Sequence, residues 1–197
     1  MDGEFYLVPG ERVANGRIRK ALRDRMTRAW DNDWPSADGP DLSLAQGKGN
    51  SADIAGVAAA MLRAVGVPTY MAAYRQRSSG TLPTQVPAPN MIDDVLVAIP
   101  GAGKDGKDLF VAFWSDAPVG TLPLDALGVN YVPLTKASEG PAYMPEPSSA
   151  ENATDRAVHL DLALDGSVKG DAMITMKGPI AAERRRRLAR MSAEERK

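Results

Sequence analysis

One segment, residues 51–65, constrains the fold of this 197-residue chain most, because nearly all of its faces are apolar or small. Its apolar residues recur at the three- and four-residue steps of an α-helix. Gly66 suits the left-handed position that follows a helix, and Pro68 cannot continue one. A helix that is apolar on most sides must be covered on most sides, so the sequence predicts a central, buried helix. The apolar positions are Ile54, Val57, Ala58, Met61, Leu62 and Val65.

The start of this helix is a suitable place for a nucleophile. Asn50 or Ser51 can cap the helix, and Asp53 lies in the first turn, where the helix dipole favours a negative charge. Free backbone amides at a helix N-terminus stabilise a thiolate or an oxyanion. Strands behind the helix could present a base and an orienting acid, which is the arrangement of Cys-His-Asp sites.

One further helix and three strands are expected around the central helix. Residues 13–30 place apolar side chains at four- to five-residue steps among arginines, which favours an amphipathic helix. Residues 31–49 are rich in Asp, Pro, Gly and Ser and are predicted as a loop. The predicted strands are residues 69–75, 92–99 and 109–114, of which the last two form an antiparallel hairpin. The first domain, residues 1–135, is therefore expected to be α+β.

The tail of the chain differs in composition. Residues 136–155 contain several Pro, Ser and Glu and are predicted as a linker. Residues 156–197 are expected to form a hairpin around the Asp165-Gly166 turn and then a basic helix that opens at Pro179. A hairpin and one helix cannot bury much apolar surface alone. They must pack on the first domain, pair with another chain by self-association through the hairpin, or begin a second domain.

Composition excludes several kinds of site. The chain has no cysteine and one histidine, His159, so a disulfide, a cysteine nucleophile, cysteine-ligated zinc and a multi-histidine metal site are ruled out. We expect no metal and no cofactor. The net charge of −1 gives no reason to expect nucleic acid as a partner, and no apolar run is long enough for membrane insertion. Residues 1–9 lack the features of a signal peptide, and the chain could be a piece of a longer protein.

Residues 49–68 resemble the nucleophile helix of bacterial transglutaminase-like proteins. They read G-N-S-A-D-I-A-G-V-A-A-A-M-L-R-A-V-G-V-P. The family has Gly, any residue, the catalytic Cys, any residue and Asp, followed by an aliphatic helix that ends in Leu-Arg-Ala-x-Gly-Ile/Val-Pro. The resemblance implies a papain-like core, in which the nucleophile helix packs on an antiparallel sheet. It also implies an exported protein of the periplasm or cell envelope.

The same resemblance assigns the catalytic positions. Ser51 stands at the cysteine position and Asp53 at the aspartate that follows it. Ile92-Asp93-Asp94-Val95 is similar to the strand start that carries the family's histidine, which puts Asp94 in its place. Trp114-Ser115-Asp116-Ala117 is similar to the segment of the family's acid, which matches Asp116. The candidate ligand-binding residues beside these three positions are Asp53, Asp93 and Trp114.

Two of the three catalytic identities are thus absent. A serine hydroxyl has a far higher pKa than a thiol, and an anionic Asp94 would not supply the imidazolium that stabilises a thiolate. We therefore expect an inactive module that binds a peptide, a cell-envelope fragment or a partner protein. One alternative is an active hydrolase or acyl-transferase with Ser51, or a natural cysteine at position 51, as nucleophile. The other alternative is a structural spacer domain.

The residues also have plain structural explanations. Ser51 can be only a helix cap, and Asp94 and Asp116 can be solvated carboxylates at strand ends or ligands of a cation. If Ser51, Asp94 and Asp116 share a cleft, the two carboxylates repel each other. A raised pKa, a bound cation with water, or an incoming arginine would relieve this repulsion, and we expect a raised pKa together with water.

Overall fold

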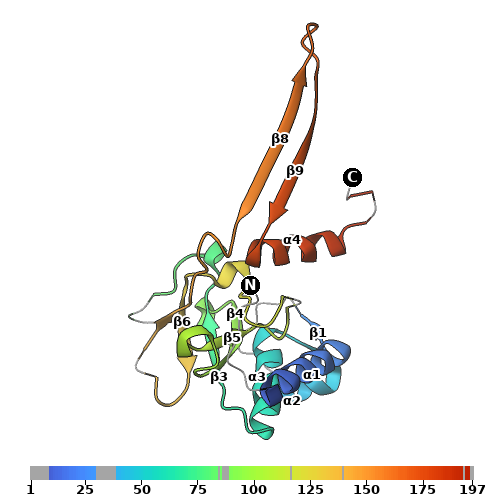
Figure 1. Cartoon of the computed structure of the whole chain (residues 1–197). Helices are drawn as coiled ribbons and strands as arrows, with labels where there is room; N and C mark the ends of the chain where they lie inside the picture. The colour runs from blue at the N-terminus through green and yellow to red at the C-terminus, as the bar shows by residue number, and fades with distance from the viewer. Residues whose placement is uncertain are drawn as a thin grey trace. The chain divides into compact units, whose positions relative to one another are not determined.

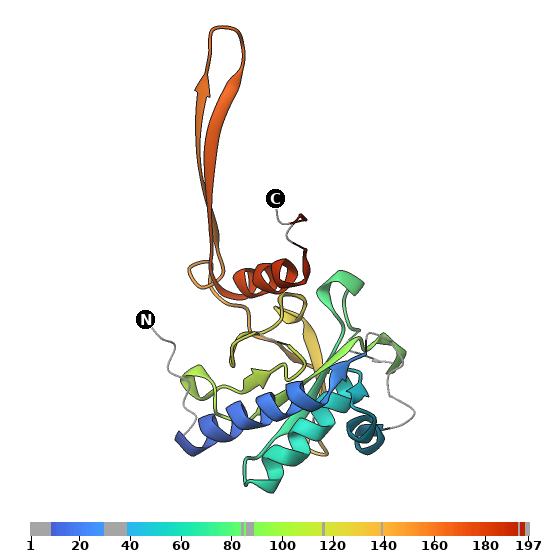
Figure 2. The same ribbon diagram turned by 90° about the vertical axis from the view of Figure 1, so that its right-hand side faces the viewer.

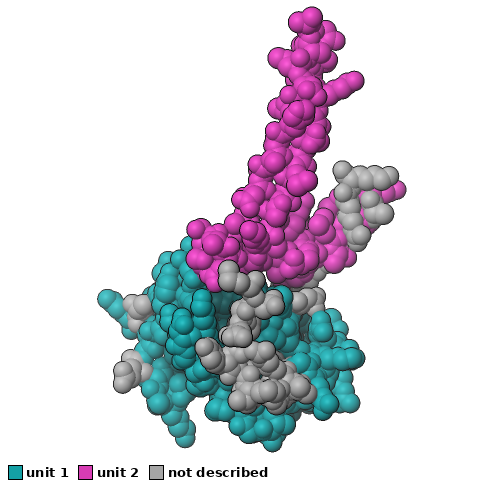
Figure 3. All heavy atoms as spheres, viewed as in Figure 1, with its two compact units in different colours: residues 1–146 teal, residues 147–197 magenta. Residues whose placement is uncertain are grey.

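The computed structural model describes residues 9–29, 39–83, 85, 89–115, 117–138, 140–192 and 194–195, with side-chain placement from Gly16 onward and without that of Arg190. The chain forms two compact units, Met1–Glu146 and Pro147–Lys197 (Figure 3). The boundary falls inside the segment 136–155 that the composition indicates as a linker. Part of that segment forms a short strand of the first unit.

A curled, five-stranded antiparallel sheet forms the centre of the first unit (Figures 1 and 2). Its strand order is β5-β4-β3-β6-β7. Tyr74, at the end of β3, pairs with Asp94, at the start of β4. The strands are β3 (Tyr70–Tyr74), β4 (Asp94–Ile99), β5 (Leu109–Val111), β6 (Asn130–Leu134) and β7 (Ala142–Tyr143).

Strand β4 lies between two apolar clusters, one on each face of the sheet. Val95, Val97 and Ile99 belong to the cluster that includes the central helix, whereas Leu96 and Ala98 belong to the other. Every residue of β4 is buried. A strand covered on both faces reads as a continuous apolar run, and the sequence from Val95 to Ile99 has this character.

The central helix is α3 (Ser51–Ala64), and it packs against β3 and β4. Helices α1 (Pro9–Arg25) and α2 (Gly39–Gln46) pack against α3 (Figure 2). Strand β1 (Thr27–Arg28), which follows α1, pairs in parallel with β2 (Lys48–Gly49), which follows α2. The predicted buried helix at residues 51–65 is confirmed, and Gly66 follows it with a φ of 82°.

Three sequence predictions for this unit need correction. The first helix ends at Arg25, because Thr27 and Arg28 leave it to pair with β2. Residues 31–49 are not all loop, since α2 begins at Gly39 with Pro40 and Asp41 in its first turn, which are ordinary helix-start residues. The third strand, predicted at residues 109–114, ends at Val111, because Phe113 and Trp114 lie in a turn.

The second unit contains a long two-stranded ribbon and one helix (Figure 1). Strands β8 (Thr154–Leu162) and β9 (Val168–Met176) pair over their whole length. Gly166 has a φ of 82° in the turn between them, and the backbone N–H of Ser167 donates to Asp165 Oδ1 at 2.9 Å. Helix α4 (Gly178–Arg190) begins with Pro179 in its first turn. No helix within the described ranges is long and apolar enough to cross a membrane.

Candidate functional site

Ser51 is the first residue of α3 and is only 3% exposed. Its Oγ accepts a hydrogen bond from the backbone N–H of Val95, at 3.2 Å, which ties the helix start to β4. The cap of the helix is the preceding residue, Asn50, whose Oδ1 accepts from the N–H groups of Ala52 and Asp53. The hydroxyl at the nucleophile position therefore has a structural contact with the neighbouring strand.

Asp53 completes the cap. Its Oδ2 accepts from the backbone N–H of Asn50 at 3.1 Å, which makes a reciprocal capping box. The residue is only 4% exposed, so Asp53 is held inside the helix start, where a ligand would have to displace the cap to reach it. Its position supports a structural role in place of the ligand-binding role suggested by the sequence.

Asp94 begins β4 and is 1% exposed, so the expectation of a solvated carboxylate is wrong. Arg28 Nη2 lies 2.5 Å from Asp94 Oδ1, and Gln76 Nε2 donates to Asp94 Oδ2 at 2.7 Å. The hydroxyl of Tyr74 donates to Oδ2 at 3.5 Å. Burial raises the pKa of Asp94, while Arg28, Gln76 and Ser51 act in the opposite direction. The cause of the raised pKa is burial, and Arg28 is the arginine that reaches the carboxylate.

Arg28 comes from β1, and its guanidinium carbon lies 3.9 Å from the centre of the Trp114 ring. Trp114 is held in turn by β4, because its Nε1–H donates to the carbonyl of Val95 at 3.1 Å. The arginine thus lies between an aromatic face and a buried carboxylate, two partners that suit its flat, permanently charged group. No local sequence signal distinguishes Arg28, which is 66 residues from Asp94 and lies in a stretch that was predicted as basic helix.

The remaining predicted residues are Asp93 and Asp116. Asp93 is partly buried, and its Oδ2 accepts from the backbone N–H of Gln76 at 2.9 Å. Asp116 lies outside the described residues. On either side of it, the carbonyls of Ser115 and Ala117 both accept from Arg19 Nη2, at 2.5 Å, which joins this turn to α1.

The arrangement has limited chemical capacity. The groups gathered at the start of α3 are a hydroxyl, a carboxylate, a guanidinium and an amide, and no imidazole is among them. The single histidine, His159, lies on β8 in the second unit, where its side chain is mostly exposed. Within the described part of the chain, no group of three or more His, Cys, Asp or Glu side chains could hold a metal ion.

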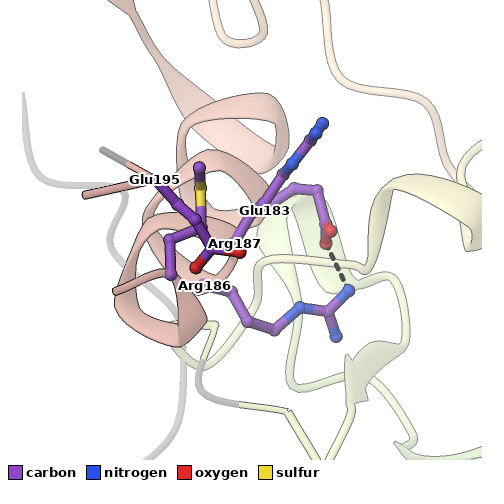
Figure 4. Close-up of a pocket in the computed structure, with 5 residues that line it drawn as sticks. Glu183, Arg186, Arg187 and Glu195 are labelled. Atoms are coloured by element: carbon purple, nitrogen blue, oxygen red, sulfur yellow. Dashed lines mark hydrogen bonds and ion pairs between the residues drawn. The ribbon is translucent and has the colours of Figure 1, made fainter. Parts of the chain in front are cut away.

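The second unit has a separate shallow pocket of about 230 Å³ along α4 (Figure 4). Glu183 forms an ion pair with Arg186 across it, and Met191 supplies an apolar contact surface. Arg184, Arg185 and Arg187 are exposed, as expected for a solvated basic face. Neither Ser51 nor Asp94 lines this pocket.

Comparison with known proteins identifies the fold. Residues 12–108 match the model of the transglutaminase-like superfamily, a span that includes Ser51 and Asp94 but not Asp116. The crystal structure of a candidate protease from Parabacteroides distasonis superposes with a TM-score of 0.51 at 19% identity, over 80% of this chain. This chain is a transglutaminase-like fold protein.

The chain spans about a third, 31%, of that Parabacteroides protein. No match is found among curated proteins. The transglutaminase-like fold confirms the predicted α+β, papain-like core and explains why the start of α3, the start of β4 and the turn after β5 all carry candidate residues. The fold positions these residues whether or not they perform chemistry.

Proposed function

We propose that this transglutaminase-like domain is a catalytically inactive module with a binding function. The main support is the ion pair between Arg28 and Asp94 beside Ser51. A base at this position would have to accept a proton from the nucleophile. The residue at this position is Asp94, a carboxylate that contacts a guanidinium and an amide and cannot supply the imidazolium that stabilises a thiolate-like nucleophile.

Ser51 adds a second argument. A serine nucleophile needs an adjacent base to become reactive, because its hydroxyl is weakly acidic. The Ser51 Oγ accepts from the N–H of Val95, its hydroxyl is hydrogen-bonded to the Asp94 carboxylate, and the residue is almost fully buried. These features suit a hydroxyl that fastens helix to strand, and none of them brings a substrate to it.

The surface beside the relic site offers a ligand two partly buried groups. Trp114 supplies an aromatic ring, and Asp93 a carboxylate that accepts from the backbone N–H of Gln76, the residue before the exposed Arg77. An aromatic face with charged groups of both signs suits an extended peptide or a segment of a partner protein. This surface is the one for which we propose ligand binding.

Activity measurements test the first part of the proposal. The wild-type chain and Ser51→Ala are assayed for hydrolysis and amine transfer on glutaminyl and glycyl peptides, with the fold of both checked by circular dichroism. We expect no turnover from either protein. Turnover by the wild type that disappears in the folded Ser51→Ala protein would overturn the proposal and favour the active-enzyme alternative.

Binding measurements test the second part. A peptide array is probed with the wild type, with Trp114→Ala and with Tyr143→Ala, a control that removes an exposed aromatic from the edge strand β7. We expect peptides whose capture is lost in Trp114→Ala and kept in Tyr143→Ala. Equal capture by all three proteins, or none by any of them, would contradict a binding surface at Trp114 and support a spacer role.

A further inference from the structure

The ribbon of the second unit has two different faces. The strand register places Val158 opposite Ala172 and Leu162 opposite Val168, with Leu160 between them opposite Gly170. The other face pairs His159 with Asp171 and Asp161 with Lys169. Because side chains alternate along a strand, one face is mostly apolar, and the other is mostly polar apart from Ala157 and Met173.

The apolar face is exposed along its length. Its large aliphatic side chains are more than half exposed, with Leu162 the highest at 75% and Ile174 the lowest at 52%. A two-stranded hairpin is marginally stable in water unless such a face is covered, and exposed apolar patches of this size mark interaction sites. The members of this apolar face are Val158, Leu160, Leu162, Val168, Ala172 and Ile174.

We propose that the apolar face of the β8–β9 ribbon docks onto the same face of a second copy of this chain. Covering two such faces would remove about 1,000 Å² from water, the size at which specific protein interfaces begin. A self-complementary patch is what a two-fold dimer requires. The polar face, with its alternating charges, would stay in water.

The centre of the face is suited to close packing. A Cβ on Gly170 would lie 2.2 Å from the backbone oxygen of His159 and 2.7 Å from Leu160 Cδ2, so only a glycine fits opposite this leucine. Flat apolar faces pack at about 10 Å separation, as the two sheets of a β-sandwich do.

The charges at the ends of the ribbon indicate the orientation. Arg156 is the one charged residue on the apolar face and lies at its base, opposite Ile174, whereas Asp165 lies in the turn at the tip. If the two ribbons run in opposite directions, each Arg156 approaches the partner copy's tip and its carboxylate. If they run in the same direction, the two guanidiniums face each other and repel.

A pair of matched variants tests the dimer. Ile174 and Met173 are neighbours on β9, both long, apolar and more than half exposed, but they lie on opposite faces. The masses of the full-length wild type, Ile174→Asp and Met173→Asp are measured by sedimentation over a range of concentrations. We expect the wild type to dimerise, Ile174→Asp to weaken the dimer at least tenfold, and Met173→Asp to leave it unchanged.

Cross-linking provides a second measurement. Because the chain has no cysteine, a single introduced thiol is unique. A short bismaleimide should join two copies of Leu160→Cys, on the apolar face, and should not join two copies of Asp161→Cys, on the polar face. A wild type that stays monomeric, whether its ribbon is protected by its own chain or not, overturns the proposal, as does a dimer in which Ile174→Asp and Met173→Asp behave alike.

Discussion

At the scale of single residues, the most informative feature is Asp94, because burying a carboxylate away from water is costly. Asp94 is almost fully covered, and its carboxylate contacts Arg28 and Gln76. Charged pairs in a protein interior lose much of their mutual attraction to desolvation. The raised pKa of Asp94 reflects that loss, because burial outweighs the effect of the arginine.

The first prediction concerns pH. The pKa of Asp94 in the folded chain is above its unfolded value, so the folded state holds this proton more tightly. The contribution of Asp94 to stability is fully present below the unfolded pKa and is lost as pH rises through the folded pKa. In urea unfolding, the unfolding free energy of the wild type minus that of Asp94→Asn should therefore fall as pH rises from acid to neutral. The fall is about 1.4 kcal/mol for each unit by which the pKa is raised. A difference that rises with pH would show that the attraction of Arg28, which lowers the pKa of Asp94, outweighs the effect of burial.

The second prediction concerns Arg28. Replacing it by methionine keeps an unbranched chain against Trp114 but leaves the buried Asp94 carboxylate without its cation. At neutral pH the Arg28→Met chain should lose about 3–5 kcal/mol of unfolding free energy, the usual cost of breaking one half of a buried pair. Adding Asp94→Leu should restore most of this loss. A double variant no more stable than Arg28→Met would show that the two residues are not coupled.

The sequence predicts these residues unevenly. Ser51 is placed correctly because the apolar spacing and the residues at the ends of α3 are local signals. Arg28 could not be identified, because its partner lies 66 residues away and ion pairs between distant segments leave no local pattern. The burial of Asp94 was missed for a related reason: a carboxylate is normally predicted to be exposed unless its counter-charge is known.

At the scale of elements, the contacts of the helices explain where prediction worked. Helix α3 carries its own start and stop signals and an apolar surface, so its existence follows from its sequence. Helix α2 is eight residues long, and at that length packing decides the structure more than propensity does. Its contact with α3 passes through Pro40 and Gly56, a close approach that no single-segment pattern reveals.

The third prediction uses two helix glycines as a matched pair. Gly16, in α1, has open space where a Cβ would be, whereas a Cβ on Gly56, in α3, would lie 2.8 Å from Pro40 Cγ. Gly16→Ala should stabilise the fold by about 0.5–1 kcal/mol, because alanine loses less backbone entropy in a helix. Gly56→Ala also reduces the loss of backbone entropy on folding, but its new Cβ would push α2 away. Its thermal midpoint should therefore fall below that of Gly16→Ala and of the wild type. Equal midpoints for the two variants would mean that α2 does not pack as described.

At the scale of the whole molecule, the two units differ in how they are stabilised. The first unit has apolar clusters on both faces of its sheet, which is the arrangement of a self-sufficient core. The second has a ribbon whose aliphatic face is open. Turn chemistry at Asp165-Gly166 and strand alternation made this ribbon predictable from sequence. What covers its apolar face is not encoded in the local pattern, because any apolar surface of suitable shape would satisfy it.

The fourth prediction tests the orientation of the proposed dimer through its end charges. Arg156→Gln and Asp165→Asn each remove one charge, and asparagine keeps the oxygen that accepts from Ser167 in the turn. If the ribbons run in opposite directions, each variant should weaken dimerisation about threefold, as exposed ion pairs are weak, and the double variant should be no weaker than one of them. The effect should fade in high salt, since exposed charges are screened. Lys169→Gln, on the polar face of the same ribbon, is the control and should change nothing.

Two outcomes would contradict this orientation. If the effects of Arg156→Gln and Asp165→Asn on the dimer dissociation constant multiply in the double variant, the two charges act independently and do not form an ion pair across the interface. Tighter association in Arg156→Gln would instead show that the two arginines face each other and that the ribbons run in the same direction.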